Sequence, residues 1–432
     1  MSNEEKKELQ MNDEKRAFIR EQIAPKRRNA FKRFMGSAVR TSCLAILFGL
    51  VGSFVFSVLT PYFDTIFEKK EGDTVAFAEP TKSPSPTPVT PSPTPEVKKK
   101  EKEEKLPVVT DIESYEQLHR EIKEIADTFN HSVVKVSGVQ SGVDWFNNPT
   151  ESKEATSGII IADSNKHLYI LTGLDKITEV THIQVTFENE ETLEGTLQGK
   201  DKDTNIAVIS VPYENISKEL RQKIKVAVLG DSYYAQAGTP VLALGSPNGY
   251  MYSMDVGIIS GNPIEEYITD RVIDVFCTDM NHIEDGNGVI VDLNGSIVGI
   301  ITHRFEKDRK VTQCMAIGIS GLKNTIEKMI QKTGRAYFGV TATNIPEEYR
   351  ENLGASRGIY VTEVVNNSPA LKAGIQVGDI ITDMNSSEIT SVAGFSGTLS
   401  VFEPKTSIKV KLLRTSQTEN KEKTVSLIIG EK

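Results

Sequence analysis

Short runs of β-branched residues separated by turn residues dominate the middle of the chain. β-branched side chains favour strands, and the intervening Gly, Asn and Asp residues favour tight turns. A helical pattern of apolar residues returns only at 322–329. Many short strands at this spacing predict a closed or sandwiched, mostly β fold. The eleven runs are 132–139, 157–162, 167–172, 183–187, 206–211, 240–244, 256–260, 272–277, 288–292, 296–302 and 313–319.

A helix is predicted immediately before the first of these strands. Thr110 and Glu113 have the spacing of a capping box, which satisfies backbone N–H groups at a helix start. Apolar residues then recur at helical spacing, which predicts one apolar helix face. These residues are Ile112, Tyr115, Leu118, Ile122, Ile125 and Phe129. We therefore place the first folded domain at 110–334.

Seven short motifs within 125–334 resemble the HtrA family of trypsin-like serine proteases, and they follow the family's order. The motifs are SGIIIA at 157–162, YILT at 169–172, KDTNIAVISV at 202–211, LGSPNG at 244–249, VGIISG at 256–261, CTD at 277–279 and VDLNGSIVGIIT at 291–302. The resemblance implies a trypsin-like double β-barrel, with two perpendicular six-stranded barrels and a catalytic cleft between them.

The three catalytic positions of that family carry other residues here. A serine nucleophile needs an imidazole to take its proton and a buried carboxylate to hold the imidazole. The family's T-N-N-H-V segment reads TGLDK, with Asp175 at the histidine position, and its T-D-[LI]-A-V segment reads TNIAV, with Asn205 at the aspartate position. Its G-N-S-G-G-P loop reads EDGNGV, one residue shorter, so either Gly286 or Asn287 stands at the serine position.

Other residues of the chain do not obviously replace this triad. His167, His282 and His303 are scattered, and none has a Ser or Cys in a Gly-rich turn beside it. Glu284 and Asp285 would bring carboxylates close to the negative charge that an oxyanion hole must stabilise. We therefore expect no catalytic residues and a pseudoprotease.

The C-terminal segment 335–432 resembles a PDZ domain of the HtrA type. Its signature is RGIYVTEVVNNSPALKAGIQVGDIITDMN at 357–385, and a helix at 391–400 should line its groove. Tyr337, Phe338, Gly339 and Val340 match the family's carboxylate-binding loop, whose backbone N–H groups can bind a peptide C-terminus. The alternative is that these four residues only begin a buried strand.

An uncharged run of nineteen residues at 41–59 is long enough to cross a hydrocarbon core of about 30 Å. Six basic and no acidic residues lie between 26 and 40, whereas acidic residues follow the run. The positive-inside rule then predicts a cytoplasmic segment at 1–38, a transmembrane helix at 39–60 and both folded domains outside the cell membrane. A cleaved signal peptide is the competing interpretation, which the long basic leader and the lack of a nearby small-x-small site disfavour.

A disordered stalk is predicted at 61–109. Seven prolines between 80 and 95 alternate with Ser and Thr, so this stretch should extend over roughly 50 Å as polyproline II, before a solvated Lys/Glu run. Within the membrane run, Ala45, Gly49, Ser53 and Ser57 would form a stripe of small residues, which favours a homo-oligomer but is also common in single membrane helices.

Charge and cysteine content exclude other classes of function. The net charge of −9 argues against a nucleic-acid partner. Cys and His residues lack the spacing of a metal site, so we expect neither a metal nor another cofactor. Of the three cysteines, Cys277 and Cys314 could form a disulfide, but two buried thiols are favoured.

Three hypotheses about function remain open at this point. In the first, the chain is a membrane-anchored pseudoprotease whose PDZ domain binds exposed peptides or unfolded envelope proteins with free C-termini, for quality control or signalling. In the second, it is an active endopeptidase that uses a non-standard site. In the third, it is a structural or signalling tether.

Overall fold

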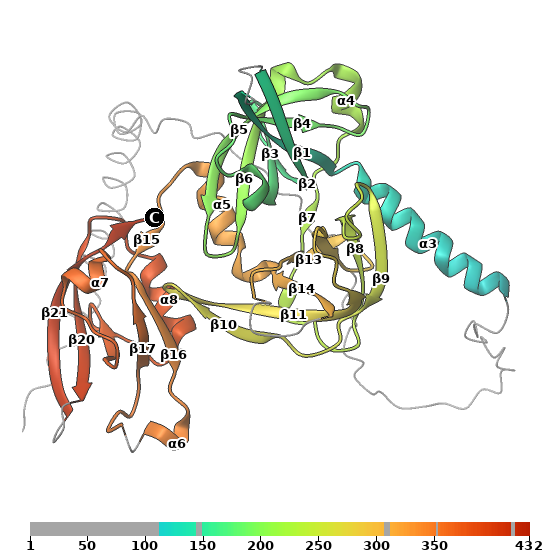
Figure 1. Ribbon diagram of the computed structural model, residues 1–432. Helices are drawn as coiled ribbons and strands as arrows, with labels where there is room; N and C mark the ends of the chain where they lie inside the picture. Colours follow the sequence, from blue (N-terminus) through green and yellow to red (C-terminus); the bar gives the residue numbers. More distant parts are fainter. Residues whose placement is uncertain (1–111, 144–148, 306–311, 351–352, 416–419) are drawn as a thin grey trace, which may run out of the picture. The chain divides into compact units, whose positions relative to one another are not determined.

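The computed structural model describes residues 112–432 except 144–148, 306–311, 351–352 and 416–419 (Figure 1). The predicted membrane run, its stripe of small residues, the stalk and Thr110 lie outside the described residues. Among those that are described, no helix has the length and apolar character needed to span a membrane. Cys277 is half-buried and Cys314 is buried, and no disulfide joins them.

Six strands close the first barrel in the order β1-β2-β3-β6-β5-β4. Alternate residues of these strands fill its interior, where Ile160, Ile170 and Ile209 are fully buried. The sequence predicts five of the six strands; β5 was missed because its residues, TLEGTLQGKD, contain no β-branched run. The strands are β1 (Val133–Val143), β2 (Pro149–Asp163), β3 (His167–Gly173), β4 (His182–Thr186), β5 (Thr192–Asp201) and β6 (Ile206–Pro212), and α4 (Lys218–Lys223) follows.

The second sheet has eight strands, two more than the six expected for the second barrel. Its order is β10-β11-β14-β13-β12-β8-β9, and β7 pairs with β13. A single bridge between Ile259 and Thr278 connects the segment after β9 to β11. The extra pairing arises because the first half of β11 continues beyond this bridge and pairs with β10 as a long hairpin. The strands are β7 (Val228–Leu229), β8 (Pro240–Ser246), β9 (Ser253–Ile258), β10 (Ile264–Ile268), β11 (Arg271–Asn281), β12 (Asn287–Val291), β13 (Ser296–Ile301) and β14 (Gln313–Gly318).

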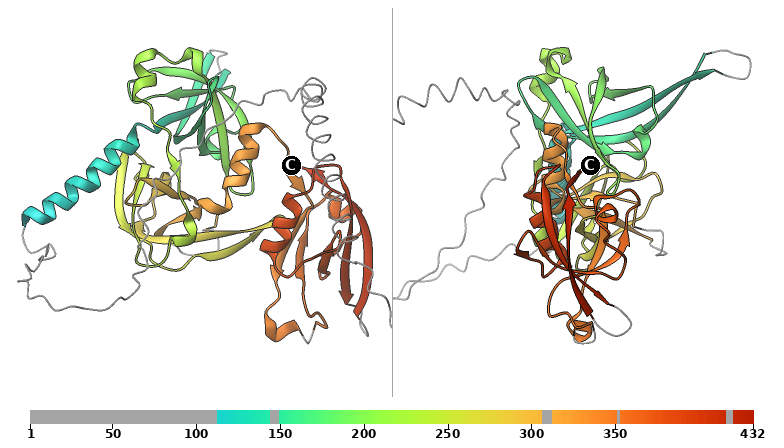
Figure 2. Two further views of the ribbon diagram at one scale, coloured as in Figure 1. Left: turned by 180° about the vertical axis from the view of Figure 1, so that it is seen from behind. Right: turned by 90° about the vertical axis from the view of Figure 1, so that its left-hand side faces the viewer.

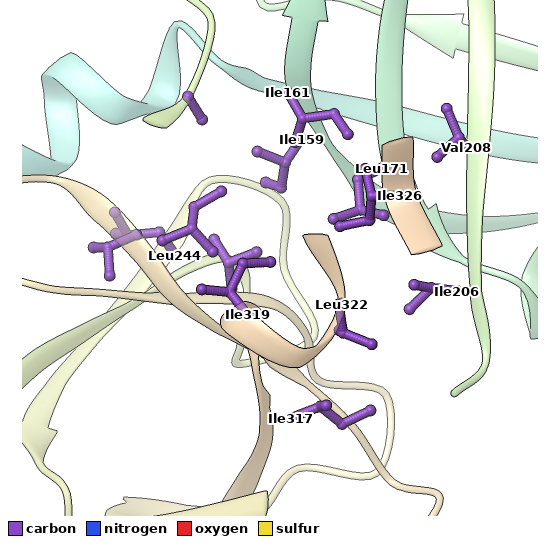
Figure 3. Packing of buried hydrophobic residues seen from close by; sticks show 14 of the residues in the cluster. Ile159, Ile161, Leu171, Ile206, Val208, Leu244, Ile317, Ile319, Leu322 and Ile326 are labelled. Carbon is purple, nitrogen blue, oxygen red and sulfur yellow. The ribbon is translucent and has the colours of Figure 1, made fainter. Parts of the chain in front are cut away.

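One apolar core joins the two barrels (Figure 3). Ile159 and Leu171 reach it from the first barrel, and Leu244 and Ile317 reach it from the second. Helix α5 (Lys323–Gln331), which confirms the helix expected at 322–329, adds Ile326. The two barrels therefore pack against each other through one shared core.

Helix α3 (Ile112–Asn130) confirms the predicted helix, but the barrels cover only its C-terminal half (Figures 1 and 2). Phe129 is buried in the shared core. By contrast, Ile112, Tyr115 and Leu118 are 77%, 58% and 47% exposed. The helical spacing is therefore right, and the apolar face is buried only in the part near the barrels.

The C-terminal domain has its own hydrophobic core, to which Phe338 and Phe395 contribute an edge-to-face pair. Its sheet has the order β16-β17-β18-β20-β21, so β16 is at one edge. The predicted helix at 391–400 is confirmed by α8, whose first turn is capped by the Ser391 hydroxyl. The elements are β15 (Ala336–Tyr337), β16 (Val340–Asn344), α6 (Glu347–Arg350), β17 (Ile359–Val364), α7 (Pro369–Lys372), β18 (Ile380–Met384), β19 (Ser387–Glu388), α8 (Val392–Ser400), β20 (Ser407–Thr415), β21 (Asn420–Ile428) and β22 (Gly430–Glu431).

Candidate functional site

A cavity of about 70 Å³ lies between the two barrels and brings the three substituted triad positions together. Asp175 and Asn205 line it from the ends of strands in the first barrel, and Gly286 and Asn287 line it from the second. Residues separated by more than a hundred positions therefore meet in one cleft, as the sequence predicts.

Only one of the two candidates for the serine position has room for a side chain. A Cβ atom added to Gly286 would lie 2.3 Å from the Pro247 carbonyl oxygen and 2.9 Å from that of Ile283. Backbone atoms cannot yield at such distances, so this position accepts only glycine. Asn287 is the first residue of β12, and its side chain enters the cleft.

Hydrogen bonds from both barrels hold the Asn287 amide in place. Its Oδ1 accepts from the Ser157 backbone N–H at 2.7 Å, from the Ser157 hydroxyl at 2.6 Å and from the Ser246 hydroxyl at 2.7 Å. Its Nδ2 donates to the Asp285 carbonyl oxygen at 3.0 Å. An amide has no nucleophilic oxygen comparable to a serine hydroxyl, so this side chain acts here as a bridge between the barrels.

The other two positions lie on adjacent turns. Asp175 begins a short 3-10 turn after β3, and the backbone N–H of Leu174 donates to the Asn205 carbonyl oxygen at 3.0 Å. Asn205 has φ of 58°, a left-handed conformation that Asn adopts more readily than most residues. The neighbouring Lys176 forms an ion pair with Asp285 at 3.6 Å, which links the first barrel to the loop before Asn287.

His303 also lines the cavity, which the sequence did not indicate. Its Nε2 lies 2.5 Å from the Gly286 carbonyl oxygen. A carbonyl oxygen can only accept a hydrogen bond, so Nε2 carries the proton and cannot take one from a nucleophile. The His282 ring packs edge-on against His303, with centroids 5.0 Å apart, whereas His167 lies on β3 near Tyr169.

One backbone N–H of the shortened loop is used within the loop itself. The Gly286 N–H donates to the Ile283 carbonyl oxygen at 2.8 Å. Glu284 and Asp285 line the same cavity, as the sequence predicts. Carboxylates at this position oppose the developing negative charge of an acyl-transfer transition state.

A buried ion pair connects β5 to β11. The Arg271 guanidinium donates to Asp201, and it also donates to the Thr325 hydroxyl at 2.7 Å. Burial alone would raise the pKa of Asp201, but the Arg271 and Arg335 guanidinium groups and the Thr204 hydroxyl lower this pKa overall. The carboxylate is therefore ionised at neutral pH and depends on its cationic partners.

The loop predicted to bind a carboxylate does hold one, but the carboxylate belongs to the chain itself. The Phe338 and Val340 N–H groups donate to Asp270 at 2.8 and 2.9 Å, and the Gly339 N–H donates at 2.7 Å. Gly339 has φ of 94°, and an added Cβ would lie 2.2 Å from the Ser368 Cβ. Tyr337 ends the short strand β15 and Val340 begins β16, so both ends of the loop match the alternative of a strand, whereas Phe338 and Gly339 lie between the two strands.

Asp270 is the residue of this second site that the sequence did not reveal. It is buried, and burial raises its pKa against the lowering effect of the three N–H groups. Among the described residues, no group of His, Cys, Asp and Glu side chains is arranged to hold a metal ion.

Models of two protein families match these two regions. The trypsin-like peptidase domain matches residues 156–300, and the PDZ domain matches residues 331–429. The chain thus combines a trypsin-like peptidase domain with a PDZ domain, as the HtrA-type proteins similar to it do. Serine protease Do-like HtrB of Bacillus subtilis is 32% identical over 262 residues, covering 55% of this chain and 54% of that protein.

Other similar proteins share this combination of domains. Serine endoprotease DegS of Haemophilus influenzae is 29% identical over 266 residues, covering 60% of this chain and 73% of that protein. The solved structure of the HtrA-type protease AlgW with decapeptide matches with a TM-score of 0.53 at 21% identity, over 72% of this chain and 98% of that one. The chain spans just over half the length of relatives such as HtrB.

Proposed function

We propose that this chain is an HtrA-type pseudoprotease whose PDZ domain captures peptide C-termini. The observation that carries the proposal is the presence of Asp175, Asn205 and Asn287 at the three triad positions of one cleft. A carboxylate and two amides supply neither a serine nucleophile nor an imidazole base. Asn287 instead bridges the barrels through Ser157 and Ser246.

Peptide capture is supported by the arrangement of donors in the loop at 337–340. Three successive backbone N–H groups converge on one carboxylate, as recognition of a peptide C-terminus requires. The edge strand β16 and helix α8 flank the loop, so a bound peptide would extend the sheet. AlgW, which shares the fold, was solved with a decapeptide. The proposed clients are exposed peptides or unfolded proteins with free C-termini.

The isolated segment 335–432 is expected to bind peptides with free apolar C-termini and to lose them on amidation. The reason is that the N–H cradle recognises a negative charge, which an amide lacks. Fluorescence anisotropy with matched free and amidated peptides measures the difference. Equal affinity for both forms would show that the loop at 337–340 is not the site.

An active endopeptidase is the second candidate, because relatives such as HtrB and DegS are named as serine proteases. Such an enzyme would need a nucleophile and a base outside the three triad positions. His303, the imidazole in the cavity, donates through Nε2 to a carbonyl oxygen, which opposes that role. A structural or signalling tether remains the third candidate.

The proposed location of both domains is outside the cell membrane, on a single-pass anchor formed by 39–60. Its support is the uncharged run with basic residues on one side only. The small-residue stripe within the run would bring two such helices together as a homo-oligomer.

Protease added to intact cells is therefore expected to remove the domains beyond the stalk and to spare roughly the first forty residues. Epitope tags at the two ends, followed by immunoblotting, report which part survives. Protection of the C-terminal tag, or a mature chain that begins after Leu59, would contradict the topology.

A further inference from the structure

The hairpin of β10 and β11 ends in a two-residue turn that points its carboxylate away from the barrel. Ile268 pairs with Arg271, so Thr269 and Asp270 form the turn. Asp270 has φ of 66°, in the left-handed region that Asp tolerates in tight turns. The residue is only 5% exposed, which is unusual for an acidic residue at a hairpin tip.

Asp270 makes the hydrogen bonds that a peptide C-terminus would make in this loop. Its carboxylate accepts from three successive N–H groups, those of Phe338, Gly339 and Val340. Its own backbone N–H donates to the Val340 carbonyl oxygen at 2.7 Å. A peptide that adds to a sheet edge through its C-terminal residue would present the same two groups to the loop, a carboxylate and an adjacent backbone N–H.

The rest of the hairpin lies along the same groove. Strand β10 contacts the edge strand β16, and β11 contacts helix α8 (Figure 1). Tyr267 and Val272 pack against the hydrophobic core of the PDZ domain. The Tyr267 hydroxyl accepts a hydrogen bond from Asn344 Nδ2 at 3.1 Å. The hairpin thus meets the PDZ domain on the two sides that a peptide ligand would use.

Ion pairs hold both the hairpin and the PDZ domain against the first barrel. Arg271 is held by Asp201 and Thr325. On the PDZ side, Arg335 and Lys432 pair with Asp203 at 3.4 and 2.6 Å. The first barrel therefore stabilises the docked state through the hairpin and through the PDZ domain, independently of any peptide.

We propose that Asp270 is an internal carboxylate that occupies the peptide site of the PDZ domain and must leave it before a client C-terminus can bind. This regulation rests on the proposed capture of peptide C-termini. The same three N–H groups cannot serve two carboxylates at once, and two such charges would repel each other. Binding is therefore weakened by the fraction of molecules in which the hairpin is docked.

The test compares peptide binding by the full-length chain, by D270N and by the segment 335–432. This segment has a hydrophobic core of its own. Asn keeps the shape and tolerates the turn but removes the charge. Glu190→Gln is the matched control, because Glu190 is an exposed acidic residue in another hairpin turn, with φ of 65°. The probes are a fluorescent peptide with a free C-terminal Val and the same peptide amidated, measured by anisotropy.

We expect the segment 335–432 to bind the free-acid peptide roughly tenfold or more tightly than the full-length wild type does. D270N should approach the affinity of the segment, and E190Q should match the wild type. If the segment binds but D270N binds no better than the wild type, internal occupation is refuted while peptide capture stands. If the segment does not bind, peptide capture itself is refuted, and the regulation with it.

A measurement on the wild-type chain covers the case in which D270N does not fold. Hydrogen exchange of the Asp270 backbone amide reports docking directly, because this amide donates to Val340 only in the docked state. A saturating free-acid peptide should accelerate its exchange, and the amidated peptide should not. Exchange that is unchanged by a bound free-acid peptide would overturn the proposal.

Discussion

Neither the wild-type chain nor the variant Asp175→His/Asn205→Asp/Asn287→Ser is expected to digest casein or an unfolded protein at a useful rate. In subtilisin, loss of the serine nucleophile alone lowers kcat about a millionfold. The wild type lacks all three triad residues. Asp175 places a carboxylate where the family uses an imidazole, and a carboxylate is the poorer base for a hydroxyl group.

The triple substitution restores the chemical groups without the geometry. The loop before Asn287 is one residue shorter than the family's pattern, and Gly286 fits only as glycine. A serine at 287 would lie beside the Ser157 and Ser246 hydroxyls that now bind the amide. A displacement of about 1 Å already reduces a rate about a hundredfold. His303 would remain bound to the Gly286 carbonyl oxygen.

The measurement is digestion by wild type and triple variant beside an active HtrA-type protease, together with labelling by a fluorophosphonate serine probe. The active protease controls for substrate quality, and circular dichroism controls for folding of the variant. Labelling and cleavage by the wild type that survive repurification would contradict the pseudoprotease and favour the endopeptidase. Strong cleavage by the triple variant alone would show that the loop geometry is intact.

Replacement of Arg271 by Met is expected to lower the free energy of unfolding by about 3–5 kcal/mol. The Asp201 and Arg271 side chains are 5% and 7% exposed. Without the guanidinium, the Asp201 carboxylate would be buried beside Thr204 with its main cationic partner removed. The double variant Asp201→Asn/Arg271→Met should recover part of the loss, because it removes the uncompensated charge as well.

Urea unfolding followed by circular dichroism measures these changes. Arg120→Met is the control, because Arg120 pairs with Glu116 at an exposed helix surface, and a loss of at most about 1 kcal/mol is expected there. The pKa of Asp201 is lowered on folding, so its contribution is present above about pH 4 and is lost as pH falls through the lowered value. A loss equal to that of Arg120→Met would show that the buried pair is not needed for stability.

The sequence by itself determined the features that depend on local residue type. β-branched runs marked most strands, because such side chains fit a pleated and buried surface. The helix predicted at 391–400 is present in spite of Gly394 and Gly397, because the Ser391 hydroxyl caps its first turn. The residues at the triad positions are likewise a property of the sequence, and the fold brings them into one cavity.

The tertiary structure decided what depends on contacts between distant segments. Strand β10, with its charged EEYI stretch, is recognisable only by its pairing with β11. The choice between Gly286 and Asn287 depends on the Pro247 carbonyl oxygen, which lies on another loop. In the sequence, Asp270 looks like an ordinary acidic residue of a solvent-exposed turn. Only the fold brings it to the N–H groups of residues 338–340, which are 68 to 70 positions away in the sequence and belong to the other domain.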